Sequence, residues 1–235
     1  IIPALRRRSL EKKWRKPVDK TVFACNPQMV NAFYAPTFNS INFPAAILQA
    51  PFFDAEADDA ANYGAIGAVI GHEMSHGFDD QGCQFDKDGN LNNWWTDEDK
   101  ANYSQRTKVL ADWFSAQEVQ PGLKVNGEKT LGENIGDNGG INVAFRALQN
   151  VMAKQPLPEK DGYSAAQRFF LSYARIWASN VAPQFVAYLV NSDVHSPNHL
   201  RVNAALPHID AWYEAWNIQP AARLYLAPDK RAHIW

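Results

Sequence analysis

The chain has 235 residues, of which 46% are apolar and 20% are charged, and its formal net charge is −2. This composition is typical of a globular protein and excludes a disordered or collagen-like chain, and the length fits one large domain or two small ones. No apolar run reaches the roughly 18 residues that a membrane span needs, and the nearly neutral balance gives no reason to expect a nucleic-acid partner.

The first twenty residues are the most basic part of the chain. They hold eight Lys or Arg against two Asp or Glu, and Pro17 follows their last apolar, helix-spaced residue, Trp14. We expect residues 1–20 to be the end of a helix that begins before Ile1. The run is short and carries acidic side chains, which favours a solvated helix over contact with a membrane or a nucleic acid.

Residues 30–43 alternate between apolar and polar side chains. Val30, Ala32 and Tyr34 would share one side of a strand, and Pro44 stops the pattern. This alternation predicts two strands joined by a turn.

Asp58 and Asp59 precede a stretch of small residues that has a helical pattern over 60–80 and can cap that helix. Three glycines lie within it, and each costs roughly 1 kcal/mol relative to alanine in a helix interior. They are Gly64, Gly67 and Gly71. Because glycines allow close approach of a neighbouring backbone, we expect this helix to be central and buried.

The rest of the chain shows helical patterns separated by polar loops. The predicted helices are 97–116, 131–154, 164–180 and 208–217. Residues 82–93 resemble a calcium loop, but Gly89 is misplaced and no closing glutamate follows, so we expect a plain turn. Cys25 and Cys83 are predicted to be free, partly buried thiols, because they are too few for a disulfide scaffold.

The sequence His72-Glu73-Met74-Ser75-His76 lies within the predicted glycine-rich helix. Residues four apart share one helix face, so both imidazoles can bind one Zn²⁺. Glu73 follows the first histidine and can reach a water on the metal as a general base. The alternative without a function is a pair of histidines on one helix face that bind no metal.

A catalytic zinc needs a third protein ligand. One class of zinc proteases places a third histidine six residues after the second, but Gly82 occupies that position here. The best candidate is Glu133, which is four residues before Asp137 on a predicted helix. Either carboxylate could bind zinc, and the other could accept the spare N–H of a ligand histidine.

Four motifs in this order resemble the neprilysin / endothelin-converting-enzyme family of zinc metallopeptidases. They are VNAFYAPTFNSINFPAAILQAPFF, GHEMSHGFDDQG, GENIGDNGG and SDVHSPNHLRVN. The resemblance implies an α+β, predominantly helical fold: a thermolysin-like zincin catalytic domain with a small β-sheet and an active-site helix that carries H-E-x-x-H. It also implies that residues 1–20 end a connector helix from an upstream helical domain, and that residues 21–235 form the catalytic domain.

The same resemblance assigns the central roles. The zinc ligands would be His72, His76 and Glu133, with one Zn²⁺ per chain, and the general base would be Glu73. Asp137 would orient the first ligand histidine and is often described in this family as a proton donor.

The resemblance also implies which residues bind the substrate. His195 would hydrogen-bond the oxyanion, Arg201 would grip a substrate carbonyl after the scissile bond, and Asn31 and Ala32 would hold the peptide backbone. Asn31 and Ala32 fall in the first predicted strand, whose free edge could pair with an extended peptide. The apolar side-chain pocket would be lined by Ile47, Phe52, Val69, Ile176 and Trp177.

The expected function is a zinc-dependent endopeptidase that cleaves oligopeptides on the amino side of hydrophobic residues, outside the cytoplasm. The expected partners are peptide substrates and the upstream helical domain, which would act as a lid. The absence of the C-x-x-W ending of animal members favours a bacterial member. The alternatives are a zinc- and peptide-binding module that is inactive without its lid, and a helical interaction protein that binds no metal.

Overall fold

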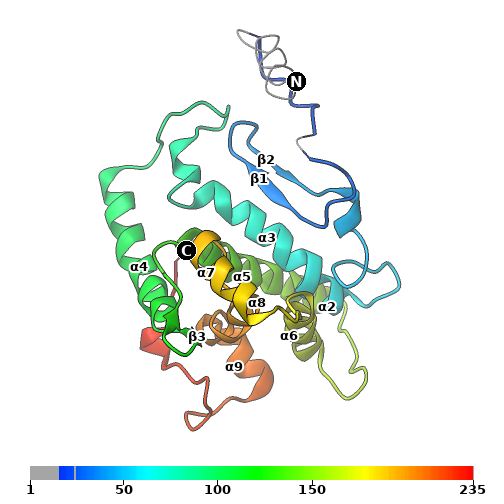
Figure 1. Cartoon of the computed structure of the whole chain (residues 1–235). Coiled ribbons are helices and arrows are strands. Elements are labelled where there is room, and N and C mark those ends of the chain that lie inside the picture. Colours follow the sequence, from blue (N-terminus) through cyan, green and yellow to red (C-terminus); the bar gives the residue numbers. More distant parts are fainter. Residues whose placement is uncertain (1–15, 24, 235) are drawn as a thin grey trace.

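The computed structural model describes residues 16–23 and 25–234. Most of the helix expected over residues 1–20 lies outside these described residues, and Lys16–Lys20 form no helix. The described chain is mostly helical and has two small two-stranded sheets, in agreement with the predicted α+β class (Figure 1). In the part of the chain that is described, no helix is long and apolar enough to cross a membrane.

The predicted glycine-rich helix is one continuous helical segment with a change of winding. It consists of α2 (Asp59–Asn62), a π-helical turn (Tyr63–Gly67), α3 (Ala68–Ser75) and a 3₁₀ turn (His76–Phe78). The Asp58 side chain accepts a hydrogen bond from the backbone N–H of Ala61, so this aspartate is the predicted cap.

Helix α3 packs closely against α5 (Leu131–Lys154). A Cβ atom on Gly71 would lie 2.8 Å from the Cα of Gly140, and one on Gly140 would lie 2.6 Å from the backbone nitrogen of His72. Only glycines allow the two backbones to approach so closely. The prediction of a central, buried helix is confirmed, and so are both bounds of the 131–154 helix.

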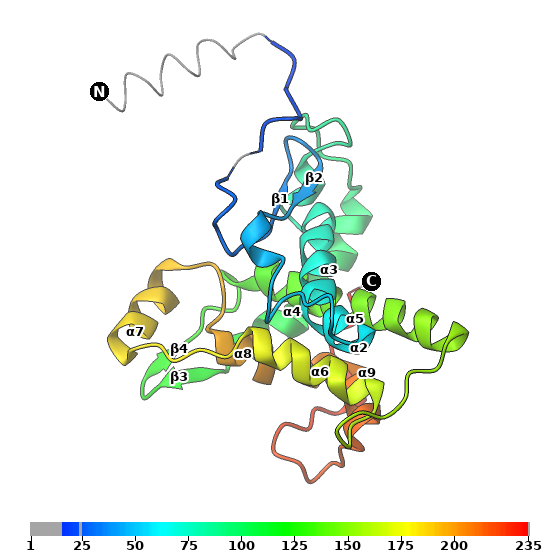
Figure 2. The same cartoon turned by 90° about the vertical axis from the view of Figure 1, so that its right-hand side faces the viewer.

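The main core lies below this crossing, where α4 (Asp97–Ser115) and α6 (Ala165–Ile176) pack against α5 and α9 (Asp210–Trp216) packs against α6 (Figures 1 and 2). Its largest fully buried side chains include Phe114, Phe169, Phe170, Tyr173, Ile135 and Ile141. Helices α4 and α6 each begin at a capping box, formed by Thr96 with Asp99 and by Ser164 with Gln167.

Two predicted helix bounds need correction. Helix α6 ends at Ile176 rather than residue 180, because the backbone N–H groups of Trp177 and Ala178 turn back to carbonyls three residues earlier. Helix α9 begins at Asp210 because Leu206–His208 form a separate 3₁₀ turn. It ends where Asn217 adopts a left-handed conformation with φ 47°.

The predicted hairpin is present but shorter than expected. Strands β1 (Phe33–Ala35) and β2 (Ser40–Asn42) pair antiparallel above α3 (Figure 1). Asn31 and Ala32 therefore precede the first strand instead of lying within it. Only β2 pairs with β1 among the described strands, so the other edge of β1 is free for a further strand.

Several short elements were not predicted. They are β3 (Glu118–Gln120), β4 (Leu123–Lys124), α7 (Pro183–Ser192), α8 (Asn198–Asn203) and the 3₁₀ turns Ala45–Ile47, Gly82–Gln84 and Pro228–Lys230. The loop over 82–93 closes as a plain turn, in which Asp86 accepts backbone N–H groups of Asp88 and Asn90. Both cysteines are free thiols, with Cys83 buried and Cys25 half-buried.

Candidate active site

Three candidate metal donors converge where α3 crosses α5. The Nε2 atoms of His72 and His76 lie 3.0 Å apart, and Oε2 of Glu133 lies 3.2 Å and 3.6 Å from them. Two ligands of a tetrahedral zinc at its usual bond lengths are about 3.3 Å apart. The three separations therefore fit one shared zinc ion.

The protonation pattern of the two histidines makes this cluster electron-rich. Nδ1 of His72 lies 2.9 Å from Asp137, and Nδ1 of His76 lies 2.9 Å from Asp79. A carboxylate only accepts hydrogen bonds, so each Nδ1 carries a proton, and each ring can offer Nε2 to a metal ion once the Nε2 proton has left. Oε2 of Glu133 is buried beside these two Nε2 atoms and that of His195, at 3.1–3.6 Å. Such a donor set needs a cation.

The pKa shifts point in the same direction. Burial lowers the pKa of His76, but its hydrogen bonds to Asp79 and Glu133 outweigh burial and raise the pKa to about 10. Burial raises the pKa of Glu133, but hydrogen bonds from His195, His72 and His76 outweigh it and hold the pKa well below its usual range. The donor atoms of this site therefore favour binding a positive charge, and protons compete with a metal ion for them.

A buried ion pair between Asp137 and Arg201 holds His72 on the Nδ1 side of its ring. Arg201 donates from Nε and Nη2 to the two oxygens of Asp137, at 2.7 Å and 2.6 Å, and Asp137 accepts from His72. The guanidinium carbon of Arg201 lies 3.7 Å from the centre of the Trp177 ring, and Tyr173 donates its hydroxyl to the Arg201 carbonyl. This chain of contacts fixes the orientation of the His72 ring.

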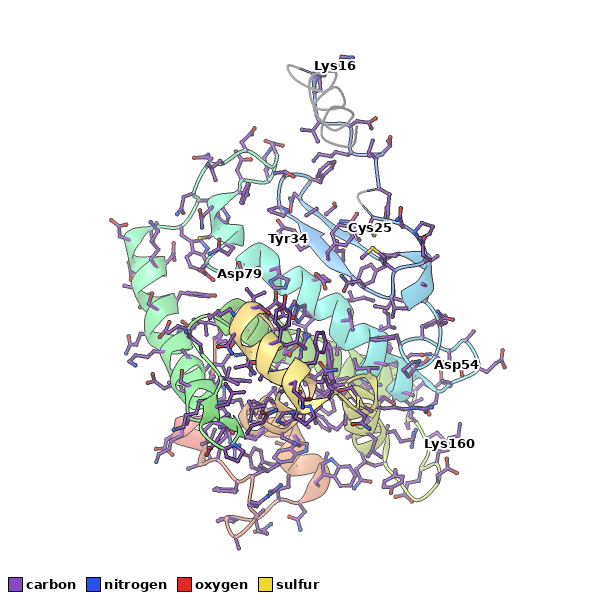
Figure 3. The ribbon with its side chains drawn as sticks, in the orientation of Figure 1. Lys16, Cys25, Tyr34, Asp54, Asp79 and Lys160 are labelled. Atoms are coloured by element: carbon purple, nitrogen blue, oxygen red, sulfur yellow. The ribbon has the colours of Figure 1, made fainter. Side chains whose placement is uncertain are left out.

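His76 has a separate support that sequence reasoning missed. Asp79 accepts from His76 at Oδ2 and from the backbone N–H groups of Gln81 and Gly82 at Oδ1. Asp79 lies just past the end of the helical segment and close to Tyr34 on β1 (Figure 3). Its position three residues after His76 was the only sequence signal for this role.

Glu73 lies on the same turn as the donors and is buried. Burial raises the pKa of its carboxyl group, while the neighbouring His72 and His76 and a backbone hydrogen bond from Tyr34 partly oppose that shift. A raised pKa suits a carboxylate that accepts and returns a proton near neutral pH.

His195 approaches the site from the loop between α7 and α8. Its Nε2 lies 3.1 Å from Glu133, and its Nδ1 lies 2.7 Å from Asp193. Hydrogen bonding to Glu133 is the largest cause that raises the pKa of His195. The next residue, Ser196, donates to Asn134 of α5 and so holds this loop against the metal cluster.

His72, Glu73, His76, Glu133 and His195 line one cavity of about 1500 Å³. It also includes Asn31, Ala32, Ile47, Phe52, Val69 and Trp177 of the predicted substrate-binding set. Ile176 is the exception: it is buried in the main core, and the cavity does not include it. Its place in a substrate pocket stays a prediction.

A helix-borne histidine pair with a glutamate from a second helix is the donor set of a zinc metallopeptidase catalytic domain. The sequence comparisons agree with that class. The profile of peptidase family M13 matches residues 31–232, and the chain belongs to this family.

Several known proteins are similar in sequence or structure to nearly the whole of this chain. Human neprilysin is 39% identical over 230 residues, which cover 95% of this chain and 30% of that protein. Neutral endopeptidase of Lactococcus lactis is 41% identical over 223 residues, which cover 95% and 34%. The zinc metalloprotease Zmp1 of Mycobacterium tuberculosis, solved in complex with an inhibitor, matches with a TM-score of 0.93 at 45% identity, covering 97% of this chain and 36% of that one. The chain thus spans about a third of the length of these relatives.

Proposed function

We propose that this chain is the catalytic domain of a zinc-dependent endopeptidase that hydrolyses peptide bonds in oligopeptides. The observation that carries the proposal is the buried Glu73 carboxylate beside a complete three-donor metal cluster, inside a cavity that can take a peptide segment. A protein that only binds metal has no use for a base in that position. Membership of peptidase family M13 supports the same reading.

Each residue near the metal has a chemical task in this mechanism. Zinc held by His72, His76 and Glu133 would polarise the scissile carbonyl and acidify a water molecule. Glu73 takes the proton of that water and delivers it to the leaving amine. His195, held by Asp193 and kept protonated by its raised pKa, donates a hydrogen bond from Nε2 to the carbonyl oxygen as negative charge develops there.

The remaining predicted residues position the substrate. Asn31 and Ala32 lie next to the free edge of β1, where an extended peptide can bind its backbone. Asp137 engages Nε and Nη2 of Arg201, which leaves Nη1 to contact a substrate carbonyl.

An apolar pocket adjoins these groups and sets the expected preference. Phe52 and Val69 line the cavity together with Trp177. Burial of apolar side chains there favours a hydrophobic residue directly after the scissile bond. Sequencing of the products by mass spectrometry tests this preference.

The proposal is tested with the zinc-loaded chain and a quenched peptide that contains one hydrophobic residue. We expect cleavage that a chelator abolishes and added zinc restores. Glu73→Gln should retain zinc and lose at least about 10³-fold in kcat/KM, because the general base is gone. Glu118→Gln, an exposed glutamate on β3, is the matched control. Near-full activity in Glu73→Gln would overturn the assignment.

A second candidate follows from the length of the relatives. Because the chain covers about a third of them, it could bind zinc and peptide without turnover until an upstream domain closes the cavity. Bound zinc and measurable peptide affinity without cleavage would support this alternative. The upstream helical lid and an extracytoplasmic location remain predictions from the resemblance.

A further inference from the structure

The cavity continues past the metal cluster into an arm that the proposed mechanism does not use. We call this region the α4 arm, and its walls include Asp80, Cys83, Trp95, Tyr103, Thr107 and Lys129. It lies beyond His76, at the end of the helical segment where Asp79 is labelled in Figure 3. The apolar pocket around Val69 lies at the other end of α3. The seven residues from Val69 to His76 correspond to about 10 Å along a helix.

Two polar atoms on the walls of the α4 arm lack acceptors. Nζ of Lys129 and the hydroxyl of Tyr103 are both shielded from solvent, and neither has an acceptor among the described residues; the backbone N–H of Asp80 approaches the Tyr103 oxygen. An ammonium group carries three donors and no acceptor. Leaving such a group buried and unpaired is costly, so its partner is expected to be an anion that enters the arm.

Three acidic side chains lie near the arm: Asp79 and Asp80 have other partners, and Glu128 is exposed to solvent. Asp79 uses one oxygen for His76 and the other for backbone N–H groups, and Asp80 accepts from the side chain of Gln81. Two lysines of α4 line the same region, and each pairs with an aspartate of that helix: Lys100 with Asp97 and Lys108 with Asp112. Among the described residues, Lys129 is thus the lysine of this region whose Nζ has no carboxylate partner.

Tyr103 adds a neutral donor at a fixed position. Its ring packs against Trp95 with 4.6 Å between ring centres. Burial, together with the charge of Asp79, raises the pKa of Tyr103, so the phenol keeps its proton. A fixed hydroxyl beside an ammonium group matches the two oxygens of a carboxylate.

We propose that the α4 arm is a subsite for an acidic side chain of the peptide, located on the amino side of the scissile bond. Lys129 is its cationic partner and Tyr103 its neutral donor. This inference rests on the proposed peptidase function. An extended peptide that places its residue after the scissile bond in the pocket near Val69 runs on past the metal toward His76, and about 10 Å equals three residues of extended chain.

The test compares quenched peptides that differ only in glutamate or glutamine at the second, third or fourth residue before the scissile bond. At one of these positions the parent chain should cleave the glutamate peptide about tenfold more efficiently in kcat/KM, as a charge-assisted hydrogen bond gives. Lys129→Met should bring this ratio close to one, and Lys129→Glu should invert it. Tyr103→Phe should lower it by less.

Lys124→Met, an exposed lysine on β4, is the control and should keep the parent ratio. A parent ratio near one at all three positions overturns the inference, and so does an unchanged ratio in Lys129→Met. Binding of the same labelled peptides to zinc-loaded Glu73→Gln, measured by fluorescence anisotropy, separates the two proposals. If no peptide is cleaved, the peptidase function fails, while the ratio of dissociation constants still supports or overturns the acidic subsite.

Discussion

Where α3 crosses α5, polar and charged side chains are buried and paired, whereas on α7 large apolar side chains are exposed. Asp137 and Arg201 are 3% and 7% exposed and bind each other through two hydrogen bonds. Phe185 and Tyr188 of α7 are 53% and 62% exposed and stack on each other's rings. Figure 2 shows α7 beside β3 and β4, away from the crossing. The crossing fixes the geometry of the metal donors, and α7 contributes little to it.

This difference predicts where substitutions are costly. At the crossing, a change leaves either an unpaired buried charge or an overlap of backbones, and both destabilise the fold and displace the donors. On α7 the same kind of change meets solvent. The following predictions test that contrast.

The largest effect is expected for Arg201→Met. It leaves the Asp137 carboxylate buried without its partner, which should lower the free energy of unfolding by about 3–5 kcal/mol. Zinc affinity should also fall by about 10- to 100-fold, because Asp137 no longer holds the His72 ring. Urea titration and zinc competition measure the two effects. Arg175→Met, an exposed arginine on α6, should change neither, and an equal effect of both substitutions would contradict the account.

Gly140→Ala should be the next most damaging change. The new Cβ would lie 2.6 Å from the backbone nitrogen of His72, so the helices must separate, at a cost of about 3 kcal/mol. Gly67→Ala is the matched control, because its Cβ would meet its nearest atom at 3.5 Å. Thermal unfolding of both variants gives the comparison. Equal melting temperatures would show that the crossing is not closely packed.

His208 gives a smaller effect that depends on pH. Burial, with His233 and Arg231 nearby, lowers the pKa of His208 to about 4. In the unfolded state the pKa of His208 is near 6.5, so between pH 6.5 and pH 4 the unfolded state binds more protons than the folded state. The contribution of His208 to the free energy of unfolding is therefore fully present above pH 6.5 and is lost as the pH falls toward 4. The loss between pH 7 and pH 5 should be about 2 kcal/mol. The free energy of unfolding is measured by chemical denaturation at pH 7 and pH 5. The drop between the two pH values should be about 2 kcal/mol larger for the parent than for His208→Gln, and equal drops would contradict the prediction.

The smallest effect is expected on α7. Phe185→Ala should change the free energy of unfolding by less than about 0.5 kcal/mol, because more than half of the side chain is already in solvent. Zinc affinity should not change. A loss above about 2 kcal/mol in urea titration would mean that α7 is packed in solution, and the contrast with the crossing would then disappear.

The same contrast explains which parts of the fold the sequence predicts. The bounds of α5 follow from its own residues, since a long helical pattern begins after Thr130 and stops before Pro156. The close helix crossing follows from the spacing of glycines such as Gly71 and Gly140. Helix α7 was missed because exposed aromatic side chains interrupt the one-sided pattern that marks a packed helix.

The convergence of two candidate metal donors was predictable for a different reason, because His72 and His76 are four residues apart on one helix. Their supports were harder to find. The contact of Asp137 with Arg201 joins residues 64 apart in sequence, and no local spacing encodes it. Without the family resemblance, Arg201 would have been taken for a surface charge. Asp79 acts from a turn after the helix ends, where helical periodicity no longer applies.

The central claim is that side chains from two crossing helices hold one zinc ion, and Glu133 is the donor that only α5 can supply. The most direct measurement is a zinc titration against a chromophoric chelator for the parent chain and for Glu133→Gln. We expect one zinc per parent chain and a loss of at least about 100-fold in affinity for the variant, because a third ligand is removed. Parent-like zinc affinity in Glu133→Gln would contradict the account.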